Sequence, residues 1–528
     1  MEVFIGLLPV FLVASTALLL IFPLVFKSRE NRIYVEYMAV TCSSIAIVMS
    51  LIVLLHVNMN DVTTYFLGGF NPPLGIAYTV DKLSALFAFL STLMLLFTVL
   101  YSSWFMVSKW NYLYYSLLFL MTAGSIGCFF TGDIFNLFVS LELLAISSYG
   151  LVAFYRDNPR AIRASLRYAI VGTVATSLYF FSTLLIYSAF GTLNMADIAL
   201  KARNPLAQTP FSHTVAGDIV FTSKIALSIM IWVFFFKSAI LPIGFTWQPY
   251  AYAEAPVPVA AGFTAIADIV GVYLFMRFTS TIFGQGVIEE LVGFRSVILS
   301  FTQIIAVISA LIASLLMVVE SNIKKFIAYS TIAQLSLALF GASLDNHYGI
   351  AAAILLVMSN TLGDAMLFYI AGIALIGYGR SIKCLSTLKA IRAYKYILIS
   401  LIIAILNLFG VIPVLIGFWG KALLILAGIE KSIVIPALVL IISGITAIGY
   451  FRLLQNTLAS STVIKSNVRL KNTTIPVLLV FTLAVISVVL GVCFIICTQF
   501  RKFILDIGLE LINDYEKYME SALVVSEL

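Results

Sequence analysis

Long uninterrupted stretches of apolar residues recur along the whole chain. Each is about twenty residues long, the length of a helix that crosses the hydrocarbon core of a bilayer. They lack the alternation of apolar and polar residues that is typical of a membrane-spanning strand, and a helix satisfies its own backbone hydrogen bonds in lipid. The pattern therefore predicts an all-α integral membrane protein of about fourteen transmembrane helices, at residues 3–26, 34–56, 82–107, 112–130, 133–154, 163–189, 219–242, 257–280, 294–318, 325–342, 347–377, 394–427, 433–457 and 474–498.

Two of the predicted helices contain residues that interrupt helical structure. The seventh includes FFFKSAILPIGF, with Pro242, and the twelfth includes NLFGVIPVLIGFWGK, with Gly410 and Pro413. Proline removes a backbone donor and glycine weakens a helix, so we expect helices 7 and 12 to be broken near mid-membrane. Broken helices in corresponding halves of a chain point to a transport site. Their separation by five helices fits two inverted five-helix repeats.

These features divide the chain into four parts. We expect transmembrane helices 1–3 in residues 1–107, the first five-helix repeat in 112–280, the second in 294–457, and the last transmembrane helix with the C-terminal tail in 474–528. In that tail, apolar residues recur at helical spacing among acidic ones. The tail is therefore expected to be an amphipathic helix, on the outer surface or against a partner.

Composition agrees with a membrane location. The 528 residues are 62% hydrophobic and 10% charged, whereas soluble domains carry about a quarter charged residues. The first apolar stretch lacks a basic region before it, so it is interpreted as a retained helix and not a signal peptide. The net charge of +7 comes from loops and does not indicate nucleic-acid binding.

Basic residues fall in alternate loops, which predicts the orientation of the chain. With these loops on the cytoplasmic side of the cell membrane, both termini lie outside. Lys201 and Arg203 are exceptions, in a loop predicted to be external. The basic loops contain Lys27, Arg29 and Arg32; Lys109; Arg156, Arg160 and Arg163; Lys324 and Lys325; Arg380, Lys383, Lys389, Arg392 and Lys395; and Lys465, Arg469 and Lys471.

No cofactor or metal is expected in this chain. The five cysteines have no metal-ligand spacing, and the sequence contains no nucleotide-binding, haem or iron–sulfur motif. Whether the chain belongs to an enzyme stays open at this point, because any electron transfer would have to take place in partner subunits.

Several ionisable residues lie inside the apolar stretches. Each would cost about 2.5–3.5 kcal/mol at a helix centre, so each needs a partner, water or a function. Buried carboxylates and lysines suit a proton relay, because moving a partner loads or releases a proton. The alternatives are buried ion pairs and, near helix ends, side chains that reach the interface. The candidates are Glu142, Lys237, Asp268, Asp364 and Lys421, with Lys224, Lys324 and Lys325 as secondary ones.

The segment around Glu142, GDIFNLFVSLELLAISSYGLV, closely resembles a signature of antiporter-like membrane subunits. This family includes the D subunits of Mrp-type cation/proton antiporters, related subunits of membrane-bound hydrogenases, and the N, M and L subunits of respiratory complex I. The segments that also match are LGGFNPPLGIAYTVDKLSALF, FGTLNMADIA, KSAILPIGF, AEAPVPVAAGF, SNIKKFIAYSTIAQ and GFWGK, which together span residues 65 to 421. The Mrp-type D subunits resemble the chain most, because of NPPLGI, TLNMAD and the short helical tail.

The resemblance implies a central hydrophilic axis through two inverted repeats. It also implies that Glu142 and Lys237 form a coupling pair and that Lys421 is the lysine on the exit side. The chain departs from the family pattern at three places. Gly244 stands where a histidine is usual, and Ile269, beside Asp268, where a lysine is usual. A histidine and a lysine of helix 11 are replaced by Asn360 and Asp364.

Three hypotheses follow. The first is a proton- or sodium-translocating subunit that works with other membrane subunits, in a Mrp-type antiporter or in a redox-driven complex of the hydrogenase or complex I type. The second, motivated by the missing lysines, is a non-translocating structural paralogue in the membrane arm of such a complex. The third, an independent transporter of organic solutes, is disfavoured by the recurring family segments.

Overall fold

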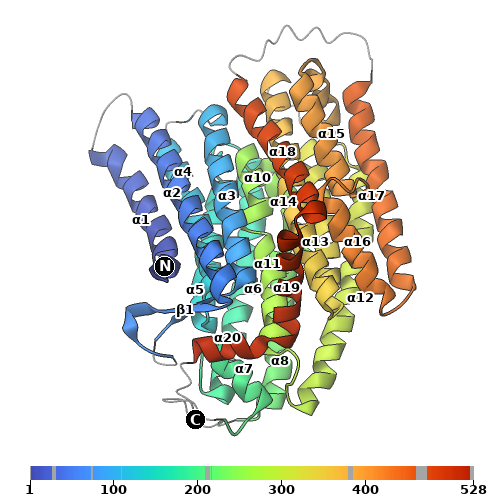
Figure 1. Cartoon of the computed structure of the whole chain (residues 1–528). Coiled ribbons are helices and arrows are strands. Elements are labelled where there is room, and N and C mark those ends of the chain that lie inside the picture. The colour runs from blue at the N-terminus through green and yellow to red at the C-terminus, as the bar shows by residue number, and fades with distance from the viewer. Residues whose placement is uncertain are drawn as a thin grey trace.

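The chain folds as a bundle of helices with one short hairpin of strands, as seen in a computed structural model (Figure 1). The structure describes residues 2–25, 31–72, 75–106, 108, 110–207, 215, 217–378, 384–459 and 473–523. The helices are α1 (Val3–Val25), α2 (Asn31–Asn60), η1 (Leu67–Gly69), α3 (Lys82–Phe105), α4 (Asn111–Phe130), α5 (Ile134–Val152), α6 (Pro159–Phe190), α7 (Met195–Arg203), α8 (Ile219–Lys237), α9 (Gly244–Glu254), α10 (Val257–Ile266), α11 (Ile269–Met276), the π-helical η2 (Arg277–Ile282), α12 (Glu289–Val319), α13 (Ile323–Ser343), α14 (His347–Tyr378), η3 (Leu385–Ala393), α15 (Lys395–Phe409), α16 (Ile416–Ile429), α17 (Val434–Leu458), α18 (Thr474–Ile496), α19 (Thr498–Asn513) and α20 (Tyr515–Ala522). The strands β1 (Thr63–Phe66) and β2 (Ala77–Val80) pair antiparallel.

The predicted all-α membrane fold is confirmed. Among the described residues, 13 helices are long and apolar enough to cross a membrane, and α10, α11 and η2 together count as one of them. The shorter apolar helices α15 and α16 follow one another through the bundle and make a further crossing (Figure 1). The chain is therefore a multi-pass membrane protein whose number of crossings matches the sequence pattern.

The centre of the bundle is formed by α14 and by the crossing at Val257–Ile282. Their most apolar windows are completely buried by other helices, whereas peripheral helices such as α6 and α12 leave many apolar side chains uncovered. Helices that are apolar all round are expected where lipid replaces water. Ionisable side chains on the central helices are therefore sealed from lipid by the protein itself.

Both predicted helix breaks are present. The seventh crossing stops at Lys237 and resumes as α9, and the twelfth stops at Phe409 and resumes as α16. The sequence pattern placed the end of the seventh crossing at 242, which was wrong, because the structure continues it as helix to Glu254. The segment GFTWQPYAYAE contains glycine, proline and polar residues, so its sequence does not predict a helix. The helix is stabilised by packing against α6 and α13.

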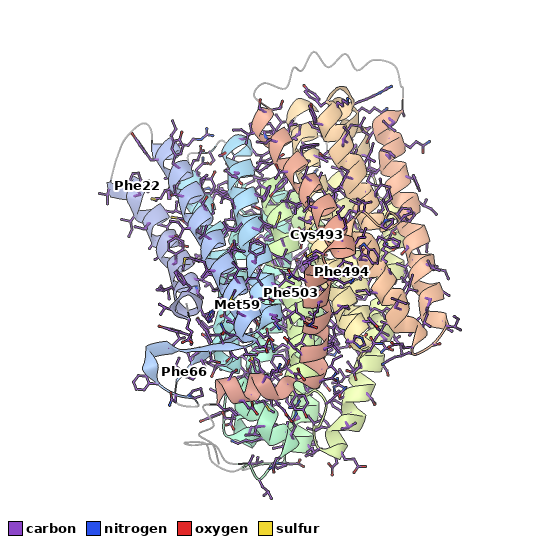
Figure 2. All side chains as sticks on the ribbon, in the orientation of Figure 1. Phe22, Met59, Phe66, Cys493, Phe494 and Phe503 are labelled. Carbon is purple, nitrogen blue, oxygen red and sulfur yellow. The ribbon has the colours of Figure 1, made fainter. Side chains whose placement is uncertain are left out.

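The C-terminal tail is helical, as predicted, and packs on its own chain. We call α19 and α20 together the C-terminal clamp. Figure 2 labels Phe494 and Phe503, which lie on either side of the corner between α18 and α19. The clamp then passes beside η2 and α7.

Ion pairs attach the clamp to the rest of the chain. Lys82 Nζ bonds to Asp61 at 2.7 Å and to Glu510 of the clamp at 2.5 Å, and Lys517 reaches Asp61 at 3.2 Å. The hydrogen bond from Lys82 lowers the pKa of Asp61, whereas burial raises the pKa of Glu510. The clamp is thus docked by charge as well as by its apolar face.

Lys201 and Arg203, the exceptions to the charge pattern, have structural partners. Lys201 is fully buried, lies 3.3 Å from Asp197 and donates to the carbonyl of Phe190 at the end of α6. Arg203 donates to several backbone carbonyls around η2. Neither is a free loop charge, and the orientation of the chain stays a prediction. Eight of the loop residues used for that prediction lie outside the described residues: Lys27, Arg29, Lys109, Arg380, Lys383, Lys465, Arg469 and Lys471.

Candidate functional site

Lys237 lies at the break of the seventh crossing. It is the last residue of α8 and is 4% exposed. Its ammonium group makes no hydrogen bond with any described residue, and the nearest aromatic contact is the Phe236 ring at 5.6 Å. The chain turns sharply after it, with Ala239 at φ 54°. A buried cation without a partner is costly, so this position suits a group that exchanges its proton or is met by water.

Glu142 lies on α5, half-buried, between the exposed side chains of Val139 and Ile146. No ion pair within 4.0 Å joins it to Lys237 in the part of the chain that the structure describes. The coupling pair implied by the family resemblance is therefore not closed in this conformation. Its role in coupling stays a prediction.

Asp268 lies at the junction between α10 and α11 and is 1% exposed. Its backbone N–H bonds to the carbonyl of Phe263, five residues back, a local widening of the helix that often marks functional sites. Its Oδ2 atom accepts hydrogen bonds from Gln248 Nε2 at 2.8 Å and from the Tyr252 hydroxyl. Both donors belong to α9, so the segment that follows the Lys237 break holds the Asp268 carboxylate.

Asp364, the second buried acid, lies on the central helix α14 and is fully buried. Its carboxylate accepts from Ser330 Oγ at 2.9 Å and from Thr331 Oγ1 at 2.7 Å, both on α13. The Tyr450 hydroxyl of α17 lies 2.7 Å from Ser330 Oγ and extends this cluster. The Asp364 carboxylate is thus held by hydroxyl groups.

Lys421 lies on α16, just after the second break, and is 5% exposed. Its ammonium group donates to the carbonyl of Phe409 at 2.8 Å, at the end of α15. A helix C-terminus carries unsatisfied carbonyls and partial negative charge, which stabilise a cation. Asn407 braces the same break, since its amide accepts from the Gly417 N–H and donates to Ser359.

Asn360 is a polar group that the sequence pattern noted but did not propose as a site residue. It lies on α14 one turn before Asp364 and is fully buried, with no hydrogen bond to either side-chain amide atom from the described residues. An amide can make four hydrogen bonds, and ordered water commonly fills such positions. The pattern missed Gln248, Tyr252, Ser330 and Thr331, because uncharged polar residues do not interrupt an apolar stretch.

The secondary candidates have different surroundings. Lys324 is 3% exposed and donates to the carbonyls of Ala253 and Ala255 at the end of α9. Lys325 lines an open pocket on the surface, and Lys224 is half-buried near the start of α8. In the described part of the chain, no two of the five main candidates contact each other directly by hydrogen bond or ion pair. Lys237, Asp268, Asp364 and Lys421 lie beside helix breaks or on the buried central helices, whereas Glu142 lies half-buried on α5.

Comparisons with known proteins place the chain among respiratory and antiporter subunits. Residues 131–448 match the family model described as NADH:quinone oxidoreductase/Mrp antiporter, transmembrane region. The chain is 30% identical to the N subunit of NADH-quinone oxidoreductase from Desulforudis audaxviator over 397 residues, 74% of each protein. It is also 30% identical to the D subunit of the Na⁺/H⁺ antiporter from Bacillus subtilis over 418 residues, 79% of this chain and 78% of that protein.

A solved structure extends the likeness to the whole chain. One chain of the membrane-bound sulfane sulfur reductase, an archaeal respiratory membrane complex, superposes with a TM-score of 0.87 at 25% identity, covering 99% of this chain and 100% of that one. The resemblance seen around Glu142 is therefore confirmed over the length of the protein. The chain belongs to the transmembrane family of NADH:quinone oxidoreductase and Mrp antiporter subunits.

Proposed function

We propose that this chain translocates protons, or sodium ions, across the cell membrane as one subunit of a multisubunit membrane complex. The observation that carries the proposal is the set of ionisable residues at the helix breaks and on the central helices. Lys237, Asp268, Asp364 and Lys421 are each at most 5% exposed. Groups this costly to bury in a membrane are typical of ion pathways.

The surroundings of each group give it a distinct part in moving a proton. Lys237 has no hydrogen-bond partner among the described residues, and it exchanges its proton with water or with Glu142 when the break opens. Gln248 and Tyr252 hold the Asp268 carboxylate, which receives the charge next. Asn360, one turn from Asp364 on α14, has no hydrogen bond to its side-chain amide from the described residues, which suits a water-filled connection toward Asp364.

The second half-channel ends at Lys421. The carbonyl of Phe409 accepts a hydrogen bond from its ammonium group, which stabilises the charged form, and release of a proton from Lys421 weakens this contact. The two breaks have a common geometry that supports the proposed inverted repeats at 112–280 and 294–457. In each, a residue of positive φ stands three positions before the proline: Ala239 (54°) before Pro242, and Gly410 (69°) before Pro413.

The partners are other membrane subunits, because the relatives named above are subunits of larger assemblies. The relatives include both an antiporter and respiratory complexes, so the driving reaction is either ion exchange or a redox reaction in partner subunits. We further propose that the end of the bundle at which α6, α13 and α15 begin faces the cytoplasm. We call this end the basic end, since Arg160, Lys325 and Lys395 lie there. Both termini are then external.

One observation favours a second function, that of a non-translocating structural paralogue. Asp268 and Asp364 are each held by neutral donors, and no lysine pairs with either among the described residues. Such acids would have a structural role only, because their hydrogen bonds would hold α9 against α10 and α13 against α14.

Replacement of each acid by its amide separates the two functions. Asp268→Asn and Asp364→Asn would be measured in inverted membrane vesicles that contain the whole complex, with pH and sodium gradients followed together. A translocating subunit loses coupled ion movement in both variants, although the complex still assembles. Unchanged ion movement in assembled complexes would leave only the structural function. The control is Ser487→Ala, a buried polar substitution on α18, at a position that is not a candidate for the ion path.

A further inference from the structure

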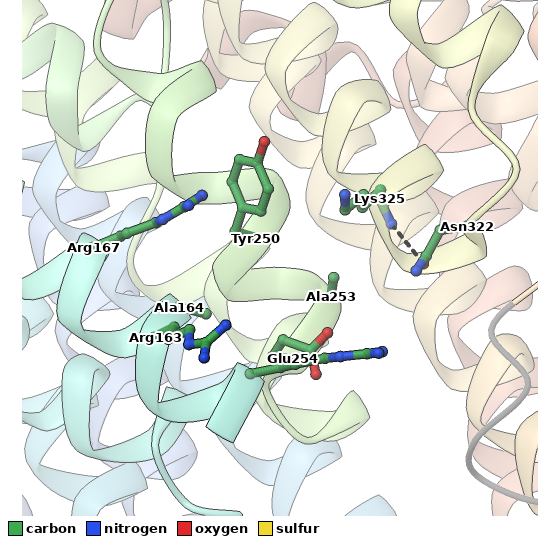
Figure 3. Close-up of a pocket in the computed structure, with 9 residues that line it drawn as sticks. Arg163, Ala164, Arg167, Tyr250, Ala253, Glu254, Asn322 and Lys325 are labelled. Atoms are coloured by element: carbon green, nitrogen blue, oxygen red, sulfur yellow. Dashed lines mark hydrogen bonds between the residues drawn. The ribbon is translucent and has the colours of Figure 1, made fainter. Parts of the chain in front are cut away.

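A pocket of about 320 Å³ opens at the basic end of the bundle, between the start of α6, the end of α9 and the start of α13. Four cationic side chains line it, together with one aromatic ring and one carboxylate. These residues are Arg160, Arg163, Arg167, Lys325, Tyr250 and Glu254 (Figure 3). None of them belongs to the ion path proposed above, and only Lys325 was among the secondary candidates.

Helix geometry gathers the three arginines. Arg160, Arg163 and Arg167 are spaced by three and four residues, so they lie on one face of α6. Neighbouring like charges at this spacing repel by a few tenths of a kcal/mol per pair, roughly 0.2–0.5. None of these three side chains, nor that of Lys325, forms an ion pair with a carboxylate among the described residues. The surface thus concentrates four positive charges that no carboxylate of the described residues holds in an ion pair, although Glu254 also lines the pocket.

Tyr250 organises two of these cations. The Arg167 guanidinium carbon lies 4.7 Å from the centre of its ring, and Lys325 Nζ also lies 4.7 Å from it. Arg167 approaches from α6 and Lys325 from α13, as Figure 3 shows. Cation–π contacts of this kind hold long side chains in place. The pocket therefore has a partly preorganised set of donors before any ligand arrives.

This set of donors fits a phosphate group. Arginine presents a planar fork that binds two oxygens of a phosphate at once, and lysine adds a compact charge. A bound anion would also relieve the repulsion among the three arginines. A carboxylate side chain would satisfy one arginine, whereas a phosphate presents enough oxygens for several donors.

The surface beyond the pocket distinguishes a lipid from a soluble anion. Beyond Arg163 on the same helix, Leu166, Ile170 and Val174 are 55%, 65% and 57% exposed. From Arg163 to Val174 the helix descends about 16 Å, at 1.5 Å per residue, toward the middle of the membrane. A free phosphate makes no favourable contact with this apolar stripe, whereas the acyl chain of a phospholipid can pack along it. Basic pockets between transmembrane helices are known to suit anionic lipid headgroups.

We propose that this pocket is a specific site for an anionic phospholipid, with the headgroup phosphate bound by Arg163, Arg167 and Lys325 and an acyl chain along Leu166, Ile170 and Val174. The site is distinct from the proposed ion path and does not depend on which ion the chain moves. It is connected to that path by α9, which carries Tyr250 in the pocket and Gln248 and Tyr252 on the Asp268 carboxylate.

Native mass spectrometry of the intact complex, released from nanodiscs that contain equal amounts of phosphatidylglycerol and phosphatidylcholine, tests the proposal. Wild type should retain phosphatidylglycerol in preference to phosphatidylcholine. The double variant Arg163→Gln/Arg167→Gln should lose this preference by about tenfold or more, as two charge-assisted contacts are removed. The matched control Arg392→Gln/Lys395→Gln removes two cations outside the pocket and should keep it.

Several results would overturn the proposal. Equal retention of the two lipids by wild type, or equal losses in the double variant and in the control, would show that the pocket has no lipid preference. Displacement of the lipid by inorganic phosphate alone would indicate a soluble-anion site. If the double variant does not assemble, a photoreactive residue at position 166 of otherwise wild-type protein decides the matter. Crosslinking to phosphatidylglycerol supports the site, and crosslinking only to another subunit contradicts it.

Discussion

The hydroxyl of Tyr252 offers the sharpest test of the Asp268 site. Tyr252→Phe removes one of the two hydrogen bonds that Asp268 Oδ2 accepts and leaves the one from Gln248. The ring itself is kept, so its packing against Phe263 at 5.5 Å and Phe368 at 5.7 Å should persist. The substitution therefore changes the polar contact with little change of volume.

The size of the effect depends on the charge of the carboxylate. A hydrogen bond to a charged group contributes about 1.5–3 kcal/mol, whereas one between neutral groups contributes about 0.5–1.5. If ionised Asp268 carries charge during transport, the loss corresponds to a slowing of roughly 10- to 150-fold, at 1.36 kcal/mol per factor of ten. Tyr101→Phe is the matched control, because Tyr101 is also fully buried but donates to the neutral carbonyl of Tyr369 at 2.7 Å.

A double-mutant cycle isolates the contact. Coupled ion movement would be measured in vesicles for wild type, Tyr252→Phe, Asp268→Asn and the double variant. The effect of Tyr252→Phe should largely disappear in the Asp268→Asn background. Two results would refute the reasoning: a loss in Tyr252→Phe no larger than in Tyr101→Phe, or a loss that is equally large without the carboxylate.

Two further predictions follow from the structure. A Cβ atom at Gly244 would lie 1.8 Å from the backbone oxygen of Ala239. Gly244→His, which introduces the residue expected from the family resemblance, should therefore destabilise the protein by about 3 kcal/mol and should not enhance transport. Thermal unfolding of the purified chain measures this, and a stable, more active variant would contradict it. Lys82 lowers the pKa of Asp61 in the folded protein. The ion pairs of Asp61 should therefore stabilise docking of the C-terminal clamp at any pH above about 3.9, the pKa of an aspartate in the unfolded chain. This stabilisation should be lost as the pH falls through the lower pKa of the folded protein. Hydrogen exchange in α19 should therefore be faster in Asp61→Asn than in wild type at neutral pH, with the difference vanishing in strong acid; a difference that is independent of pH would refute this account.

The sequence was sufficient to predict the membrane crossings, because a helix in lipid needs a long apolar stretch and leaves a clear pattern. It was also sufficient to select the buried charges, since Lys237, Asp268 and Lys421 interrupt such stretches. The two breaks were predictable from Pro242 and Pro413. In each of these cases the signal is local, and a few adjacent residues contain it.

The contacts of the site could not be predicted in the same way. Gln248 and Tyr252 lie in α9, whose glycine and proline resemble a loop, and its helical form depends on packing between α6 and α13. The clamp residue Glu510 is joined to Lys82 across 428 positions of the sequence. Such pairs depend on how helices that are distant in the sequence pack together, and the spacing of residues along the chain does not predict this packing.

The most direct test of the central claim is ion movement by the whole complex after neutralisation of the candidate coupling pair. Glu142→Gln and Lys237→Ala would be compared with wild type in inverted membrane vesicles, with pH and sodium gradients recorded together. Lys431→Ala, an exposed lysine in the turn between α16 and α17 that is not a candidate for the ion path, serves as the control. The account predicts that both test variants assemble and lose coupled translocation while the control keeps it, and the ion that stops moving is the cargo. Unchanged translocation in assembled Lys237→Ala complexes would contradict the account and leave the chain a structural subunit.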